Sequence, residues 1–140
     1  MSEENKALMR REIEEVWNKH NPGAIDEFFA PDFVNRSAQP GQPNDREGVK
    51  ATVSGFFSAL PDLKATLDFL VAEGDKVVLR TTLTGTHSGE LMGIPATGKR
   101  VQVTAITIVR IAGGKIAELW SEADMMGMMQ QLGVVPAPAG

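Results

Sequence analysis

Asp124 is the acidic side chain best placed for proton transfer in this sequence. It follows an alternating run, 115–123, that predicts a strand, and it precedes an apolar segment that predicts a short helix. A carboxyl group at a strand end, beside an apolar interior, can serve as a general acid or base. The same position also suits a helix N-cap, whose carboxylate accepts backbone N–H bonds. The sequence leaves both interpretations open.

Two other polar side chains, His87 and Asn35, are candidates for the same site. His87 ends the long strand expected over 76–86, where it could stabilise an oxyanion or titrate near neutral pH. Alternatively, it fixes the following loop through hydrogen bonds. Asn35 precedes a loop, so it could line the rim of a pocket or simply form a turn.

The remaining candidates would bind a substrate. Arg80 lies in an otherwise apolar run, so it could bind a carbonyl or carboxylate group. Alternatively, it could form a structural ion pair with Glu118, Glu122 or Asp124. The methionines of 125–129 have flexible thioethers that suit an adaptable pocket wall. The expected apolar wall otherwise comprises Trp120, Phe33, Phe56, Phe57 and Leu79.

Composition removes several other kinds of chemistry. The 140 residues include no cysteine and no tyrosine, so thiol catalysis, thiolate metal sites and phenol donors are excluded. No metal-ligand cluster or phosphate-binding glycine loop is present in the sequence, so we expect neither a metal nor a cofactor. A net charge of -4 argues against nucleic acid or anionic membranes as partners. The charged N-terminus and the lack of long apolar runs predict a cytoplasmic protein.

Helices are expected first and strands afterwards. The helical pattern is expected over 3–19, 25–29 and 46–60, with a brief strand at 33–35. Strands are expected over 65–71, 76–86, 100–111 and 115–123, followed by a short helix over 125–132. This order predicts an α+β domain with helices on one face of a curved antiparallel sheet. The open end of such a cone is a natural place for a mostly apolar pocket. We expect one domain over 1–135 and a flexible tail over 136–140.

The ordered motifs of the chain resemble those of the SnoaL-like polyketide cyclases. The motifs are PDFVN, GTHSGELMGIPATGK, GGKIAELW, Asp124 and QQLG. This ester cyclase family belongs to the nuclear transport factor 2-like superfamily. The resemblance covers nearly the whole chain, and it implies a cone-shaped α+β barrel with three N-terminal helices and a long curved sheet.

The resemblance also implies roles for particular residues. Asp124 matches the acid/base of an intramolecular aldol closure, Asn35 matches an asparagine that lines the same pocket, and His87 matches the histidine of the GTH motif. Three features depart from the family pattern. Arg36 stands where a histidine is frequent, Ala96 stands where the family often has a second proline, and the expected strand 100–111 carries no histidine. These departures concern the substrate and leave the fold unaffected.

Three functional hypotheses follow. The first is a cofactor-independent acid/base enzyme that acts on a small hydrophobic, polyketide-like carbonyl compound; cyclisation, isomerisation and epoxide hydrolysis all suit it. The second is a non-catalytic protein that binds a small molecule in the same pocket. The third is an interaction scaffold, and we expect a homodimer formed through the sheet, which is compatible with either pocket role.

Overall fold

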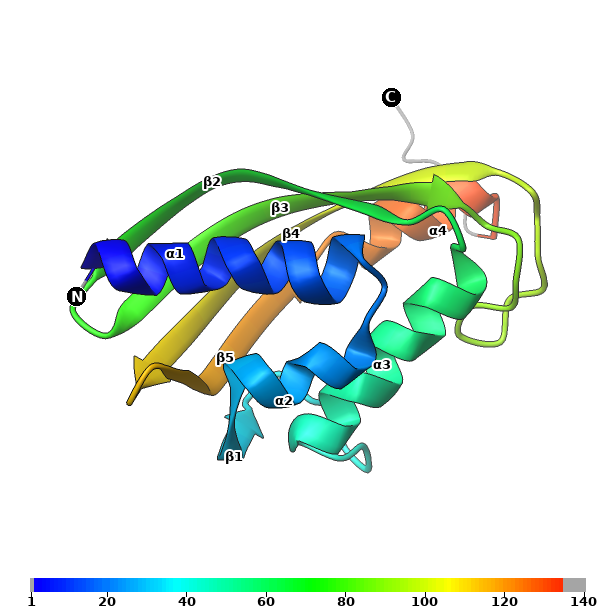
Figure 1. Ribbon diagram of the computed structural model, residues 1–140. Coiled ribbons are helices and arrows are strands. Elements are labelled where there is room, and N and C mark those ends of the chain that lie inside the picture. The colour runs from blue at the N-terminus through cyan, green and yellow to red at the C-terminus, as the bar shows by residue number, and fades with distance from the viewer. Residues whose placement is uncertain (1, 135–140) are drawn as a thin grey trace.

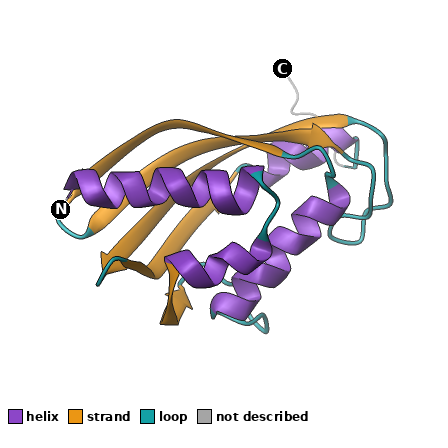
Figure 2. Cartoon of the chain, in the orientation of Figure 1, coloured by secondary structure: helices purple, strands orange, loops and turns teal. Residues whose placement is uncertain are grey.

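Three helical segments lie inside the curve of a long sheet in the computed structural model (Figure 1). The structure describes residues 2–134, and the tail expected over 136–140 lies outside them. Figure 2 shows the two layers, with the helices on one side of the strands and the last helix behind them. The α+β architecture predicted from the sequence is therefore confirmed. No helix of residues 2–134 is long and apolar enough to cross a membrane.

The first helical segment has two parts. Helix α1 (Ser2–Glu12) is α-helical and continues into the π-helix η1 (Ile13–Asn18). The amide of Lys19 donates to the Glu14 carbonyl at 3.0 Å, and the amide of Asn21 donates to the Val16 carbonyl at 2.9 Å. Bonds between residues five apart widen the helix, so the expectation of one regular α-helix over 3–19 was incomplete.

Short elements then lead to the edge of the sheet. The turn η2 (Pro22–Ala24) and helix α2 (Ile25–Phe28) precede strand β1 (Phe29–Asn35). This strand is longer than expected because Phe29, Ala30 and Phe33 are buried. Helix α3 (Arg46–Ala59) follows, and Asp45 caps it by accepting from the Gly48 amide at 3.0 Å.

Four long strands form the rest of the sheet. They are β2 (Lys64–Glu73), β3 (Lys76–Thr86), β4 (Arg100–Ala112) and β5 (Lys115–Ala123), and they pair antiparallel in sequence order. The turn between β4 and β5 places Gly113 and Gly114 at φ values of 59° and 75°, which glycine adopts without strain. Helix α4 (Met125–Leu132) follows β5.

Strand β1 joins the far edge of the sheet by pairing parallel with β5. The strand order is β1-β5-β4-β3-β2, so β1 and β2 form opposite edges and the sheet is curved without closing into a complete barrel. This parallel pair was not predicted from the sequence. It brings the first third of the chain beside the last strand.

Two clusters of buried side chains lie between the helices and the inner face of the sheet. One gathers around Phe28, Val77 and Ile116, and the other around Leu60 and Met128. Alternation along the strands directs Leu79 toward the first cluster and Val103 toward the second. The space between the two clusters holds the candidate site.

Candidate active site

An apolar cavity of about 230 Å³ lies between the helices and the inner face of the sheet. Residues of both core clusters line its wall. The lining residues are Met9, Glu12, Ile13, Trp17, Phe29, Asn35, Val49, Thr52, Val53, Phe56, Leu79, Thr81, Leu83, Val103, Ala105, Thr107, Val109, Leu119, Ser121, Ala123 and Met125. Most are apolar, so a ligand there is shielded from water by hydrocarbon and contacts only a few polar groups.

Small side chains on the inner face of the sheet leave this cavity open. Thr81 on β3 pairs with Ala105 on β4, which pairs with Ala123 on β5. Larger residues, Leu79 and Leu83, lie two positions to either side of Thr81 on the same face. A row of short side chains across three strands therefore faces the helices without filling the space beneath them.

Glu12 is the one ionisable side chain among the described residues that line the cavity. It lies at the end of α1 and is only 5% exposed. Burial raises the pKa of its carboxyl group to about 8, and a hydrogen bond with the Trp17 side chain lowers that pKa by a smaller amount. At neutral pH this carboxyl group is therefore mostly protonated.

The sequence analysis missed Glu12 although a signal was present. Glu12 is three residues after Met9 and four before Val16, which places it on the apolar stripe of the first helix. A glutamate on such a stripe must either reach solvent or be buried. The structure shows that it is buried, together with Met9 and Val16.

Hydroxyl and amide groups form the polar part of the wall on the sheet side. The hydroxyl oxygens of Thr107 and Ser121 lie 3.1 Å apart across the β4–β5 pair. Asn35 lines the cavity, and its side-chain oxygen accepts from the Ser37 amide at 2.9 Å. Its amide NH₂ is the part left to donate to a ligand. The pocket-rim and turn interpretations of Asn35 are therefore compatible.

Asp124 lies outside the cavity, contrary to the expected placement. Its side chain is exposed and caps α4 by accepting from the Gly127 amide at 2.9 Å. Its backbone amide donates to the Thr104 carbonyl at 2.9 Å. Leu119, Ser121 and Ala123 face the cavity, so alternation along β5 directs the next residue, Asp124, away from it. Of the two interpretations that the sequence left open, the structure shows the helix cap.

His87 also lies outside the cavity, although it is fully buried. Its Nδ1 atom is 3.0 Å from the Thr97 hydroxyl oxygen, and the Thr97 amide donates to Nδ1 at 3.3 Å. Its backbone amide donates to the Lys99 carbonyl at 2.8 Å. The histidine therefore holds together the loop between β3 and β4, as the structural interpretation anticipated.

Arg80 and Trp120 point away from the cavity. Arg80 forms an ion pair with Asp68 at 2.8 Å on the outer face of the sheet, and neither residue lines the pocket. The ion-pair interpretation of Arg80 holds, but the expected partners Glu118, Glu122 and Asp124 were wrong, because the partner is Asp68 on the neighbouring strand β2. Trp120 alternates with Leu119 and Ser121, which face the cavity, so its ring lies on the outer face.

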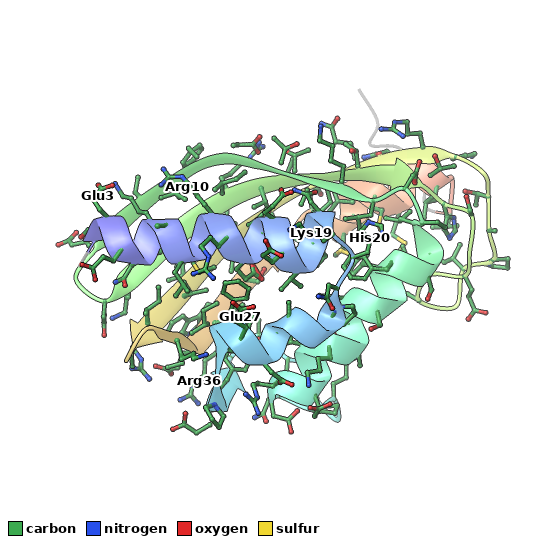
Figure 3. All side chains as sticks on the ribbon, in the orientation of Figure 1. Glu3, Arg10, Lys19, His20, Glu27 and Arg36 are labelled. Carbon is green, nitrogen blue, oxygen red and sulfur yellow. The ribbon has the colours of Figure 1, made fainter. Side chains whose placement is uncertain are left out.

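The expected aromatic wall is divided between the cavity and the core. Phe56 and Leu79 line the cavity, whereas Phe33 packs edge-on against Phe29 with ring centroids 4.8 Å apart. Phe57 stacks on His20, whose ring lies 4.4 Å away where the π-helix ends (Figure 3). Phe33 and Phe57 therefore support the wall from behind. Substrate binding by Phe56 and Leu79 stays a prediction.

The methionines of α4 have different environments. Met125 lines the cavity, Met128 is buried in the core, and Met126 is 62% exposed. Of these three methionines, Met125 therefore forms part of the adaptable cavity wall that was expected of all the α4 methionines. Within residues 2–134, no three His, Cys, Asp or Glu side chains lie close enough together to bind a metal ion.

Comparison with known proteins identifies the class to which this fold and cavity belong. The family model of the SnoaL-like polyketide cyclases matches residues 7–132, so the chain belongs to that family. The resemblance drawn from the motifs is thereby confirmed.

Two curated cyclases and one solved structure are similar to this chain over most of its length. The aklanonic acid methyl ester cyclases DauD of Streptomyces sp. (strain C5) and DnrD of Streptomyces peucetius are each 33% identical over 138 residues. The match covers 95% of this chain, 84% of DauD and 94% of DnrD. The solved structure of TsrD from Streptomyces laurentii is 35% identical with a TM-score of 0.86, and the match covers 94% of this chain and 96% of TsrD.

Proposed function

We propose that this protein is a cyclase that closes a ring in a small hydrophobic carbonyl compound without a cofactor. The observation that carries the proposal is the water-shielded apolar cavity, with one carboxyl group and a few hydrogen-bonding groups in its wall. Membership of the polyketide cyclase family supports the same reaction class.

An intramolecular aldol closure suits such a wall. A proton leaves the carbon next to one carbonyl, that carbon attacks a second carbonyl, and the resulting alkoxide receives a proton. No atom is gained or lost overall, so the product is an isomer of the substrate. The amide of Asn35 and the hydroxyls of Thr107 and Ser121 can donate to the oxygen that becomes negative.

The size of the cavity restricts the substrate. Its volume of about 230 Å³ is below the roughly 300–1,000 Å³ typical of pockets for drug-sized ligands. A multi-ring substrate therefore requires the wall to move. Met125 is the wall residue with the most adaptable side chain, because a thioether has several low-energy rotamers.

The direct test uses the substrates for which the relatives are named. Aklanonic acid methyl ester, and nogalonic acid methyl ester, for which a related cyclase of Streptomyces nogalater is named, are each incubated with the purified protein. Products are separated by liquid chromatography with mass detection. We expect a new peak of unchanged mass that carries one ring more. Failure with these and with smaller diketones, while the ligands bind, would reject the cyclase proposal.

The acid/base role expected of Asp124 stays a prediction. Its carboxylate is occupied with the Gly127 amide and lies outside the cavity, so the role would require α4 to rearrange. Asp124→Asn tests it, because asparagine also caps a helix but cannot exchange the proton.

The second candidate is a non-catalytic binding protein. The described wall contains neither histidine nor tyrosine, and its hydroxyl and amide groups are suited to binding as much as to chemistry. Native mass spectrometry that shows a retained ligand, with no turnover of the esters, would favour this alternative.

A homodimer through the outer face of the sheet is the proposed assembly. Val71, Val78, Ile108 and Trp120 are paired in one row across four strands, on the face opposite the cavity. In the adjacent row Phe69 and Ile106, which are 58% and 52% exposed, alternate with Arg80 and Glu122. Exposed apolar side chains of this kind suit association with a second copy. A cytoplasmic location stays a prediction.

A further inference from the structure

We propose that Glu12 is the catalytic residue that carries the proton in this cavity. Its carboxylate removes a proton from the carbon beside the substrate carbonyl. The resulting carboxylic acid returns that proton to the alkoxide formed on ring closure. This inference rests on the proposed cyclase function and names the residue that the reaction needs.

The geometry supports Glu12 over the other acidic residues. The reacting carbon of a bound ligand must lie in the cavity, and Glu12 is the one described lining residue whose side chain can accept and release a proton near neutral pH. Asp124 and His87 both lie outside the lining. A proton-transfer group must be within hydrogen-bond reach of the substrate, directly or through one water.

The surroundings of Glu12 also differ from those of a structural glutamate. Within residues 2–134 no lysine or arginine pairs with it, and its neighbour Arg11 pairs instead with Glu27 at 3.2 Å. The strands opposite present Leu79, Thr81 and other uncharged side chains to the cavity. Burial raises the pKa of Glu12 and the hydrogen bond with Trp17 partly lowers it.

The proton balance of the proposed step is closed. The C–H bond breaks as the carboxylate takes the proton; the C–C bond forms as the enolate attacks the second carbonyl; the O–H bond forms as the acid returns the proton. Glu12 ends as it began, and no oxidant, metal or co-reactant is needed. Because burial raises its pKa to about 8, the carboxylate is a stronger base than an ordinary glutamate. Roughly a tenth of the protein is ionised at pH 7.

The experiment separates proton transfer from ring closure. 1-Indanone deuterated beside its carbonyl is incubated with the full-length protein in H₂O, and loss of deuterium is followed by mass spectrometry between pH 6 and 9.5. Glu12→Gln keeps the size of the side chain and removes the proton carrier. The matched control is Glu15→Gln, which alters a partly exposed glutamate paired with Lys19 on the same segment.

We expect the wild type to accelerate the exchange, with a rate that rises with pH around a midpoint of about 8. Glu12→Gln should lose about 10²–10⁴-fold, the usual contribution of a general base, and Glu15→Gln should behave as the wild type. Glu12→Asp, which keeps the carboxyl group, should retain part of the rate and the rising pH profile. Circular dichroism establishes that each variant is folded.

A second readout needs no substrate. In a Trp120→Phe background, Trp17 is the one remaining tryptophan, and its fluorescence should change with a midpoint near pH 8 that Glu12→Gln abolishes. A midpoint near the ordinary glutamate value would overturn the inference.

The outcomes distinguish the proposed cyclase function from the proposed role of Glu12 as proton carrier. Exchange that depends on Glu12, without cyclisation of any ester, rejects the cyclase and supports the proton carrier. Cyclisation at the wild-type rate by folded Glu12→Gln supports the cyclase and overturns the role of Glu12. A wild type that exchanges no faster than buffer also overturns it.

Discussion

Glu12 and Trp17 face the same cavity although they lie five residues apart in one helical segment. In an α-helix of 3.6 residues per turn, residues five apart point in clearly different directions. The π-helix from Ile13 to Asn18 has bonds between residues five apart, so such residues lie one above the other. The wide turn therefore brings an aromatic N–H donor to the buried carboxyl group.

Glu12 should make the protein less stable as the pH rises. The carboxyl group has a pKa of about 8 in the folded state and 4.5 without burial, so between these values the folded state holds one more proton than the unfolded state. The free energy of unfolding then falls with rising pH. Relative to Glu12→Gln, the wild type should lose about 3–4 kcal/mol between pH 5 and pH 8. Urea unfolding at several pH values measures this difference.

The comparison with the glutamine variant removes the pH dependence of the other groups. Parallel curves for the two proteins from pH 5 to 8 would contradict the raised pKa. Above about pH 9.5 both curves should again run parallel, because Glu12 is then ionised in the folded and in the unfolded state.

Replacing Asp124 should affect helix α4 and leave the cavity unchanged. Asp124→Ala removes the bond to the Gly127 amide and should cost about 1 kcal/mol, whereas Asp124→Asn should cost less. Thermal unfolding measures both values. A loss of 100-fold or more in turnover by Asp124→Asn, with stability unchanged, would restore Asp124 as the acid/base group.

Filling the cavity should abolish ligand binding without removing Glu12. Ala105 lies in the middle of the row of short side chains, so Ala105→Leu places three more carbons in the open space. We expect loss of 1-indanone binding in calorimetry and thermal stability equal to or above that of the wild type. Ala51→Leu, on an exposed turn of α3, is the control. Unchanged binding by Ala105→Leu would place the ligand site elsewhere.

A charged side chain on the outer face of the sheet should dissociate the proposed dimer into monomers. Ile106 is 52% exposed, and Ile106→Glu would place a second carboxylate beside Glu122 on each copy of the proposed interface. Sedimentation velocity should show a dimer for the wild type and a monomer for the variant. The control variant Ser58→Glu, which changes an exposed position of α3, should remain dimeric. A monomeric wild type at micromolar concentration would reject the assembly.

Periodicity was sufficient to predict most of the fold. The alternating patterns of β3, β4 and β5 and the paired glycines of the last hairpin gave strand positions close to those of the structure. The parallel pairing of β1 with β5 could not be predicted in this way, because it joins residues such as Phe29 and Ile116 that are far apart in sequence. Short buried strands carry little periodic signal of their own.

The site was predicted less well than the fold, because position in sequence does not fix the direction of a side chain. Asp124 comes one residue after the inward-facing Ala123, and that single step separates a pocket acid from a helix cap. Glu12 was overlooked because glutamate is ordinarily exposed on a helix. Its burial depends on the sheet that covers the helix, which only the tertiary structure shows.

The pairing of β1 with β5 also decides when the binding site comes into existence. Glu12 and Asn35 are synthesised before Leu119, Ser121 and Ala123, which lie on the last strand of the sheet to be made. A nascent or truncated chain that stops before β5 has no wall opposite β1 and no neighbour for that strand. The wall of the cavity is therefore complete only once β5 pairs with β1, whose residue Phe29 lies 87 positions before its partner Ile116 (116 − 29).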